Sequence, residues 1–359
     1  MNSDFPINLF LLPSENKNNK YINLFSSSLH KANPLTNVIA LKGDSLVNVI
    51  PYLSLSKTSG AKNIIHVQWS TVLYGSRFLL KSLFLFAVNI FLLVFIKSFF
   101  RFKIVWTIHN FSAHDYPHPF IDTIGRRILF AISNCVVVQQ QSTLSSYRAR
   151  YPHKNVQYVP HGNYIDVYGM PIERDYALRR SLGFKDDDIV LISLGAIAPY
   201  KLNEKIIDAV VAARKEAPNL KLLIAGKGNE RYVETLIHRA STDPGIVVQN
   251  RFISDSDLPR YLSIVDYSVF YYDQSEMTSG GMILSLSYGV PVIIRDIPAA
   301  EIVTSKNGHI FNKEDELVNI LKKIKSSPTQ QHSRGIINDM RVFDWSNSAK
   351  NLINIYDNL

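Results

Sequence analysis

Short apolar runs rich in β-branched residues recur along this 359-residue chain, separated by segments of helical length. In the first half they cover 7–13, 37–41, 64–69, 103–110, 135–140 and 156–160, and in the second half 189–195, 221–228, 245–253, 267–273 and 291–296. Nearly continuous apolar strands are typical of parallel sheets with helices on both faces. The alternation therefore predicts an α/β protein with doubly wound, Rossmann-like sheets.

One segment between the two sets of runs breaks this pattern. Residues 163–187 are polar and contain Gly and Pro. A chain of this length, 46% apolar, is expected to form two α/β domains. We predict a first domain over 1–165, a linker over 166–187 and a second domain over 188–340. Ligands of such sheets bind beyond the carboxyl ends of the strands, so the two domains are expected to face each other across a cleft.

Cysteine content and the amino terminus indicate the compartment. The single cysteine, Cys135, lies in an apolar run, which excludes a disulfide framework and a cysteine-based zinc site. The first twenty residues lack a basic region followed by a long apolar stretch and a small-residue cleavage site. We therefore expect a cytoplasmic protein.

The formal net charge of +9 favours anionic partners. Acidic lipid head groups, phosphorylated substrates and nucleic acid all fit this charge. The basic residues are scattered, and no zinc-finger, RNP-type or basic-zipper pattern occurs, so no nucleic-acid partner is expected.

The segment 81–103 raises the question of a membrane. Fifteen residues, 82–96, separate Lys81 from Lys97, and only Ser82 and Asn89 among them are polar. As a helix they would span roughly 22 Å, less than the ~30 Å hydrocarbon layer, so this segment is not expected to cross a bilayer alone. Flanking cations (Lys81, Lys97, Arg101, Lys103) favour contact with an anionic membrane surface. A buried helix between two parallel strands fits equally well, and both descriptions can hold for different faces.

Residues 276–293, EMTSGGMILSLSYGVPVI, predict a strand-to-helix turn that binds an anion. Thr278 or Ser279 can cap the helix, which Gly289 would end. The backbone N–H groups of Gly280, Gly281 and Met282 would then lie at the positive end of the helix, where a phosphate or diphosphate binds. Glu276, just before that end, could accept hydrogen bonds from sugar hydroxyls. A plain tight turn with an ordinary flanking acid is the alternative.

Two other strand ends carry candidate residues. Gly195 and Lys201 follow the first strand after the proposed linker, where an ammonium group can neutralise a leaving diphosphate. His109 follows the 103–110 strand and could hydrogen-bond a substrate hydroxyl. The nearby His114, Asp115 and His118 lack the spacing of a helical metal pair, and no metal is expected. His161 and Asn163, in HGNY, are placed on the acceptor side, with an inter-domain turn as the alternative.

Several common enzyme classes lack their sequence signatures here. No P-loop, GxSxG elbow or HExxH motif occurs, and the two glycines of 226–228 do not complete a dinucleotide fingerprint.

Five motifs in order resemble those of bacterial glycosyltransferases with the GT-B fold. They are TIHNFSAHD, YVPHGNYIDVYG, LGAIAPYK, LLIAGKG and SEMTSGGMILSLSYGVPVI, within residues 100–301. The pattern is most similar to the family 4 group that builds capsule, exopolysaccharide or O-antigen chains. The resemblance implies sugar transfer from a nucleotide-diphosphate sugar without a metal or other cofactor. It also implies that 341–359 forms a helix crossing back to the first domain.

The resemblance assigns roles to individual residues. Lys201 would hold the diphosphate together with the backbone of Ser279, Gly280 and Gly281. Glu276 would contact the donor sugar, and His109 would line the reaction centre. The remaining candidates are Gly195, Thr278 and Glu301 on the donor side and His114, His161 and Asn163 on the acceptor side.

The sequence departs from the family pattern at two places. Leu284 replaces the second glutamate of the usual acid pair, and Ala196 and Ala198 stand in a loop that usually carries an arginine. Arg251, at another strand end, is the expected substitute for that arginine by position.

The resemblance predicts a retaining transferase acting on a glycan acceptor, lipid-linked if 81–103 meets a membrane. Two alternatives remain open. A GT-B epimerase would act on the nucleotide sugar itself, and a non-catalytic subunit would bind a partner transferase.

Overall fold

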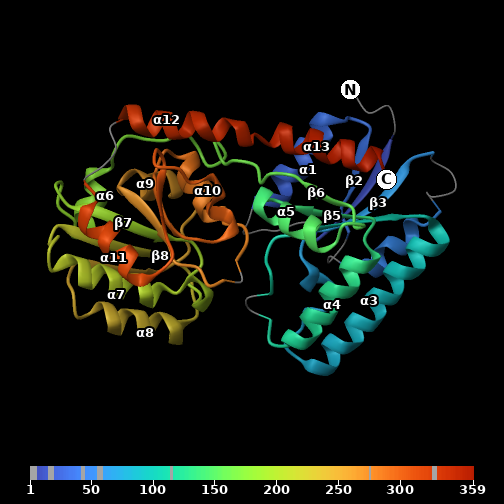
Figure 1. The fold of residues 1–359 in the computed structure, drawn as a ribbon, viewed down its shortest axis with the longest axis horizontal. Helices are drawn as coiled ribbons and strands as arrows, with labels where there is room; N and C mark the ends of the chain where they lie inside the picture. The colour runs from blue at the N-terminus through green and yellow to red at the C-terminus, as the bar shows by residue number, and fades with distance from the viewer. Residues whose placement is uncertain are drawn as a thin grey trace. The chain divides into compact units, whose positions relative to one another are not determined.

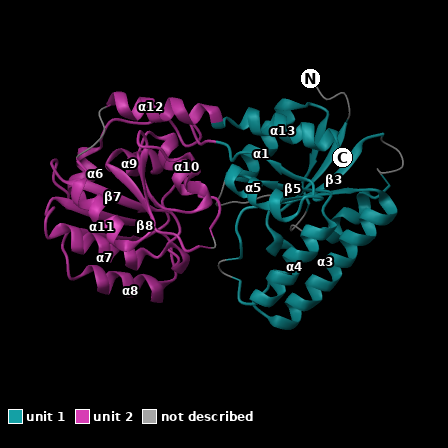
Figure 2. Ribbon diagram, viewed as in Figure 1, with its two compact units in different colours: residues 1–162, 343–359 teal, residues 163–342 magenta. Residues whose placement is uncertain are grey.

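A computed structural model describes residues 6–14, 20–41, 45–54, 60–113, 116–274, 276–325 and 330–359. The chain forms two compact units (Figure 2). Unit 1 comprises residues 1–162 together with 343–359, and unit 2 comprises residues 163–342. Each unit contains one parallel six-stranded sheet. The predicted α/β class with two Rossmann-like domains is therefore confirmed.

The sheet of unit 1 has the strand order β2-β1-β3-β4-β5-β6. Its strands are β1 (Ile7–Leu12), β2 (Thr36–Ile39), β3 (Lys62–Val67), β4 (Lys103–Ile108), β5 (Cys135–Val138) and β6 (Val156–Tyr158). Every neighbouring pair is parallel. The carboxyl ends of β3, β4 and β5 therefore lie along one edge, and the polar residues that follow these strands are brought together there.

Helices cover both faces of this sheet (Figure 1). On one face α1 (Tyr21–Ala32) and α13 (Trp345–Asp357) pack against each other and against inward side chains of the central strands. On the other face α3 (Leu79–Phe100) and α4 (Pro119–Ile132) pack against each other and contact β4. The helix α5 (Gln141–Arg150) follows β5. The final segment thus rejoins the first unit, as the resemblance implied.

The sheet of unit 2 has the order β12-β11-β10-β7-β8-β9. Its strands are β7 (Ile189–Leu194), β8 (Leu220–Gly226), β9 (Ile246–Asn250), β10 (Tyr267–Phe270), β11 (Val292–Arg295) and β12 (Gly308–Phe311). The sequence predicted five of these strands and missed β12. That strand, GHIF, is short, begins with Gly and lies at the sheet edge, so it lacks the apolar run that marks the others.

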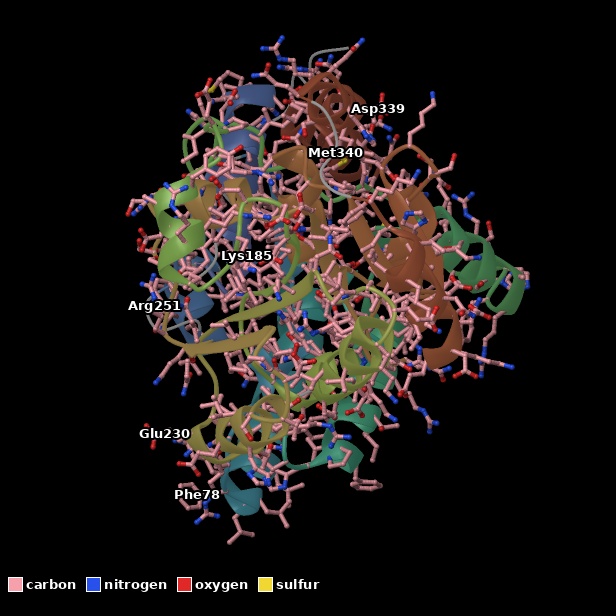
Figure 3. All side chains as sticks on the ribbon, turned by 90° about the vertical axis from the view of Figure 1, so that its left-hand side faces the viewer. Phe78, Lys185, Glu230, Arg251, Asp339 and Met340 are labelled. Atoms are coloured by element: carbon pink, nitrogen blue, oxygen red, sulfur yellow. The ribbon has the colours of Figure 1, made fainter. Side chains whose placement is uncertain are left out.

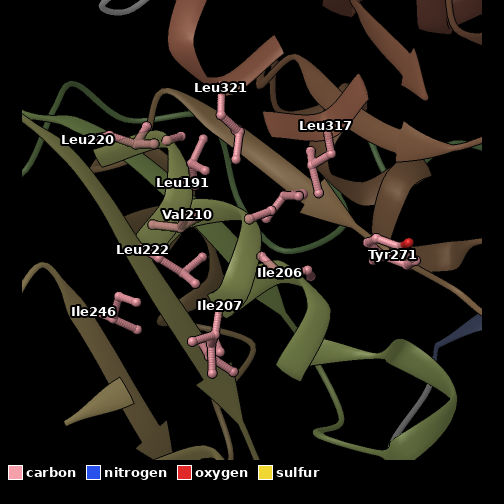
Figure 4. Close-up of a cluster of buried hydrophobic side chains, with 14 of the residues drawn as sticks. Leu191, Ile206, Ile207, Val210, Leu220, Leu222, Ile246, Tyr271, Leu317 and Leu321 are labelled. Atoms are coloured by element: carbon pink, nitrogen blue, oxygen red, sulfur yellow. The ribbon is translucent and has the colours of Figure 1, made fainter. Parts of the chain in front are cut away.

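Alternating side chains of the unit 2 strands build two cores. Leu191 and Leu222 point to one face, where they pack against α7 (Asn203–Arg214), α8 (Glu230–Ala240) and α11 (Glu314–Lys323) (Figure 4). Val190 and Ile192 point to the other face, towards α9 (Leu258–Ser263) and the end of α10 (Gly280–Ser287). Burying each Leu or Ile contributes roughly 1.5–3 kcal/mol, so these layers hold the strand ends rigidly.

The segment expected as a linker belongs to unit 2. The boundary falls between residues 162 and 163, and 166–187 includes the short helix α6 (Tyr176–Ser181). Arg179 of α6 is fully buried and donates to the carbonyls of Ile264 (2.5 Å), Lys185 (3.0 Å) and Asp188, beside Asp266 (3.6 Å). The polar composition of this segment therefore reflects a buried arginine network as well as exposed turns.

The apolar helix α3 is longer than predicted. It covers 22 residues, Leu79–Phe100, instead of the expected 82–96. At 1.5 Å per residue it is about 33 Å long, enough to span a bilayer by length. The lysines at its expected ends are good helix formers and do not stop it. Of the helices in the described ranges, α3 alone has the length and composition of a membrane span.

Replacing Arg179 by Met should destabilise unit 2 alone, by about 3 kcal/mol, because Asp266 and three carbonyl groups lose a buried donor. All three tryptophans lie in unit 1, so their fluorescence reports that unit only. Urea unfolding followed by far-ultraviolet circular dichroism should show an earlier transition, while the tryptophan transition stays in place. The exposed neighbour Arg180, paired with Asp186 at 3.4 Å, provides the control Arg180→Met, which should move neither transition. Equal effects of both variants would contradict this assignment.

Candidate functional site

The donor half of the candidate site lies in unit 2, at the carboxyl ends of β7 and β10. These two strands are neighbours in the sheet, with Leu191 opposite Tyr267. Gly195 directly follows β7 with φ +103°, a conformation that favours glycine. The 3-10 turn η4 (Pro199–Lys201) follows and directs the Lys201 side chain back under the strand end. The Lys201 ammonium donates to the Leu194 carbonyl at 3.0 Å, and the residue is buried.

The second component is the start of α10, which begins as the sequence predicted. Ser279 caps the helix, with its hydroxyl accepting from the Met282 N–H at 3.1 Å. The prediction that Met282 offers an unpaired N–H is therefore wrong. Within the described residues no acceptor is recorded for the N–H groups of Gly280 and Gly281. These two amides lie at the positive end of the helix and are available to an anion.

Lys201 and the first turn of α10 lie close together. The Leu194 carbonyl oxygen is 3.0 Å from Lys201 Nζ and 3.8 Å from the place where a Cβ on Gly281 would lie. The Asp273 N–H donates to the Tyr200 carbonyl at 2.8 Å, which ties the loop after β10 to η4. Two glycines at the helix start leave the backbone open to a bulky anion. The ammonium group and the helix amides are therefore arranged to hold one diphosphate.

Burial and one carboxylate set the charge state of Lys201. Desolvation lowers the pKa of Lys201 to about 8, and the nearby negative charge of Glu276 acts in the opposite direction. Glu276 is itself buried, at the end of the same loop. Tyr272, whose hydroxyl lies 2.8 Å from Ser279 Oγ, is buried beside them, and its pKa is raised mainly by desolvation and also by Glu276. Lys201 and Glu276 thus form a desolvated pair of cation and anion. A bound diphosphate would add negative charge beside the Lys201 ammonium.

The remaining donor-side candidates are less closely gathered. Thr278 lies directly before the helix cap, in the same loop as Glu276. Glu301 is exposed in η5 (Pro298–Ile302), after β11. Arg251 follows the edge strand β9, which β8 separates from β7, and lies at the periphery in Figure 3. It donates to Tyr261 and pairs with Asp257, and its role as the substitute for the family's arginine stays a prediction.

Unit 1 contains a separate cavity of about 450 Å³ beside His109. It is lined by residues that follow β3 and β4 and by one side of α4, among them Gln68, Trp69, Arg77, Trp106, His109 and Arg126. His109 stacks on Trp69, with ring centroids 4.7 Å apart, and its Nε2 donates to Gln68 Oε1 at 3.1 Å. The Arg126 guanidinium lies over the Trp106 ring and donates to Ser70 Oγ at 3.3 Å and to the Asn110 carbonyl. Aromatic faces with a fixed guanidinium suit a sugar or phosphate-bearing acceptor.

His109 is neutral in this environment. Desolvation, together with the proximity of His161 and His66, lowers the pKa of its imidazole to about 3. His109 lies on the wall of the unit 1 cavity, and its expected place in a cleft between the domains stays a prediction. At neutral pH it can donate or accept a hydrogen bond but is a weak base.

The other acceptor-side candidates take structural roles or lie outside the description. His161 is buried between Tyr21 and Trp345, and its Nδ1 donates to the Gly162 carbonyl at 2.6 Å. Asn163 is buried in unit 2, where it donates to the Met340 carbonyl and accepts from the Ile165 N–H, so it fixes a turn. His114 and Asp115 are outside the described residues. No group of three or more potential metal ligands occurs in the described part of the chain.

Sequence reasoning missed several residues of both halves. Gln68 and Trp69 are the first two residues after β3, in the motif HVQWS, and Tyr272 is the second residue after β10, in YYD. Their positions after strands were therefore available signals. Arg126 had none, because it lies inside α4 and reaches the cavity only through the packing of that helix.

The two parallel six-stranded sheets with their covering helices define a GT-B-type architecture. Residues 175–339 match the sequence model of the family described as Glycosyl transferases group 1. The match covers most of unit 2 and all of the donor half. The matched region is slightly under half of the chain, so it shows similarity to this family for unit 2.

Two curated relatives are similar in sequence. The α-monoglucosyldiacylglycerol synthase of Acholeplasma laidlawii is 29% identical over 159 residues, which is 44% of this chain and 39% of the relative. The D-inositol 3-phosphate glycosyltransferase of Stackebrandtia nassauensis is 26% identical over 268 residues, 69% of this chain and 59% of the relative. The alignments thus span less than two thirds of either relative.

Solved structures share the fold over nearly the whole chain. Sucrose-phosphate synthase of Thermosynechococcus elongatus is 16% identical with a TM-score of 0.67, covering 98% of both chains. Anabaena HepE in complex with UDP-glucose is 15% identical with a TM-score of 0.65, covering 98% of this chain and 99% of that one. At these identities the likeness establishes the GT-B fold alone.

Donor affinity should fall with rising pH. With the pKa of Lys201 at about 8, the fraction of charged ammonium drops about tenfold between pH 7 and pH 9, and affinity for a diphosphate should drop with it. A thermal-shift screen of UDP-, GDP- and dTDP-sugars selects the probe, and calorimetry then measures its dissociation constant across this range. Lys201→Met should bind weakly with no such dependence. An unchanged pH slope in the variant would contradict the assignment.

Unit 1 should lose stability in acid. Burial holds the pKa of His66 at about 3, and those of His109 and His161 at about 3 and 4, whereas unfolded histidine titrates near 6.5. The contribution of the three neutral histidines to the free energy of unfolding is therefore complete above about pH 6.5. It is lost towards pH 4, by roughly 1.4 kcal/mol per pH unit for each histidine. Urea unfolding followed by tryptophan fluorescence measures this slope. His66→Gln should reduce it by about a third, while the exposed His153→Gln should leave it unchanged.

Proposed function

We propose that the chain is a glycosyltransferase that moves a sugar from a nucleotide-diphosphate sugar to an acceptor hydroxyl. The observation that carries the proposal is the buried Lys201 ammonium beside the open amides of Gly280 and Gly281, within residues that match the glycosyltransferase family. A desolvated cation and a helix start at one point form a binding site for a diphosphate leaving group.

In the proposed reaction the bond between the sugar C1 and the diphosphate oxygen breaks, and a bond from C1 to the acceptor oxygen forms. Lys201 and the α10 amides hold the diphosphate and stabilise the charge that it gains on departure. Glu276, buried in the same loop, accepts hydrogen bonds from the donor sugar. Gly195 and Thr278 line this half, and no metal is required for leaving-group stabilisation.

The acceptor binds in the unit 1 cavity. His109 and Gln68 orient its hydroxyl, and Trp69 and Arg126 provide a stacking face and a fixed positive charge. Because the pKa of His109 is held at about 3, the proton of the acceptor hydroxyl passes more readily to the departing diphosphate than to this imidazole. His109 therefore acts by hydrogen bonding in this proposal.

The acceptor is proposed to be a lipid-linked glycan in surface-polysaccharide synthesis at the inner face of the cell membrane. The similarity to a synthase named for a glucosyldiacylglycerol product, and the apolar helix α3, support a lipid-bearing acceptor. Retention of the anomeric configuration is proposed from the family resemblance. Nuclear magnetic resonance of the product anomer tests it directly.

Lys201→Met should lower turnover by about 100- to 1,000-fold, because the leaving group loses its buried cation. Release of nucleoside diphosphate from the screened donor measures turnover, with diacylglycerol vesicles and octyl glucoside as acceptor probes. Lys205→Met is the matched control: Lys205 lies four residues on, exposed and paired with Glu314, and should retain full activity.

Three results would contradict the proposal. Conversion of the donor sugar to an epimer without acceptor would indicate a nucleotide-sugar epimerase. Donor binding without turnover on either acceptor or in hydrolysis would indicate a non-catalytic subunit. Equal activity of the Lys201 and Lys205 variants would remove the diphosphate site from the mechanism.

A further inference from the structure

The surface helix α3 buries polar side chains and exposes large apolar ones, the reverse of the usual arrangement. Its buried positions include the two polar residues Ser82 and Asn89, together with Leu93 and Ile96. Its exposed positions carry large apolar side chains: Leu79, Leu80, Leu83, Phe84, Phe91, Val94 and Phe99. Leu80 is 81% exposed and Phe99 is 73% exposed. A helix that is apolar all round is normally buried in a core or in lipid. Only 22% of an 18-residue apolar stretch of α3 is buried in the structure.

Specific hydrogen bonds fix which face of α3 points outward. Ser82 Oγ donates to the Tyr74 carbonyl at 2.8 Å, and Asn89 Nδ2 donates to the Leu73 carbonyl at 2.7 Å. Lys97 Nζ donates to the Ile132 carbonyl at the end of α4. These contacts occupy the polar side chains along one side of the helix. The apolar side chains on the other side are therefore held outward, and Figure 3 shows the adjoining Phe78 extending from the periphery of the molecule.

Charge identifies the partner of this surface. No Asp or Glu occurs between Asp44 and Asp115, a stretch that carries seven Lys and Arg residues. Unit 1 contains 17 Lys and Arg against 7 Asp and Glu, whereas unit 2 contains 22 against 23. Arg77, Lys81 and Arg101, at the two ends of the apolar surface, are exposed. An apolar strip bordered by cations matches the acyl and head-group layers of an anionic bilayer.

We infer that α3 docks unit 1 on an anionic lipid bilayer. The helix lies in the interfacial plane, with Leu80, Phe84, Phe91 and Phe99 among the acyl chains and Arg77, Lys81 and Arg101 at the head groups. It does not cross the bilayer, because it connects β3 to β4 of one sheet and packs against α4. Ser76 and Arg77 also line the unit 1 cavity, just before α3 begins, so docking places this cavity at the lipid surface. Delivery of a lipid acceptor to it rests on the proposed function, whereas the docking itself does not.

Sedimentation of the full chain with vesicles tests the inference without any sugar substrate. The protein should bind vesicles of phosphatidylcholine with about one third phosphatidylglycerol, and bind pure phosphatidylcholine at least tenfold more weakly. Leu80→Ser/Phe84→Ser/Phe91→Ser should reduce binding to the anionic vesicles by about a hundredfold or more. Met170→Ser/Ile237→Ser/Phe252→Ser removes comparably exposed apolar side chains from unit 2 and should bind like the wild type.

A charge variant and two further measurements separate the alternatives. Arg77→Gln/Lys81→Gln/Arg101→Gln should abolish the preference for anionic vesicles and leave the weak binding to pure phosphatidylcholine. Light scattering should show the wild type and the α3 variant in the same oligomeric state; a dimer that dissociates in the variant, with no vesicle binding by either, would assign the surface to a second copy. Resistance of the bound protein to alkaline carbonate extraction would overturn docking in the interfacial plane. Equal vesicle binding by the two triple-serine variants would overturn the role of α3.

Discussion

The candidate chemistry depends on parallel pairing of β7 with β10. Because the two strands run in the same direction in adjacent positions, the loops that follow them emerge at one edge, although about eighty residues separate Lys201 from Ser279 along the chain. The Leu194 carbonyl, at the end of β7, accepts from Lys201 Nζ and also lies beside the first turn of α10. The helices α7 and α9 and the end of α10 pack on this sheet and hold the loops in place. An anion site made of one ammonium and two amides needs that rigidity, since each group contributes only when held at hydrogen-bonding distance.

Both halves rely on desolvated groups whose charge states differ from those in water. Lys201 and Glu276 are buried together, and the partial loss of hydration makes the ammonium more responsive to an arriving diphosphate. In unit 1 burial instead removes charge, because it lowers the pKa values of His66, His109 and His161. These histidines stay neutral and serve as hydrogen-bonding and packing groups. The neutral His66 ring hydrogen-bonds to both Tyr356 of α13 and Thr107 of β4. These bonds connect the C-terminal helix to the sheet of unit 1.

Sequence patterns predicted what depends on local apolar runs and missed what depends on tertiary packing. Eleven of the strands in the described ranges coincide with apolar runs, and the cap and end of α10 follow from Ser279 and Gly289. The polar composition of 166–187 suggested a linker, but these residues include Arg179, which is buried and donates to the Ile264 carbonyl 85 residues away as well as to a nearby carbonyl. The sequence did not predict the cavity or the position of Arg126 in it. The cavity forms where α4 packs against the loops that follow two different strands. The length of α3 was underestimated because charged ends were read as helix ends.

The partition of charge between the units explains how one chain can meet two kinds of anion. Unit 2 has nearly balanced charge, so long-range attraction contributes little to donor binding, and selectivity for a diphosphate must come from the few groups at the ends of β7 and β10. Unit 1 carries essentially the whole net positive charge, and the cations at the ends of the α3 surface belong to this unit. Long-range attraction to an anionic surface therefore acts on the unit that holds the proposed acceptor cavity. In the proposed function a free nucleotide sugar is recognised only at short range, where the buried lysine and the open amides of α10 would distinguish a diphosphate from other anions.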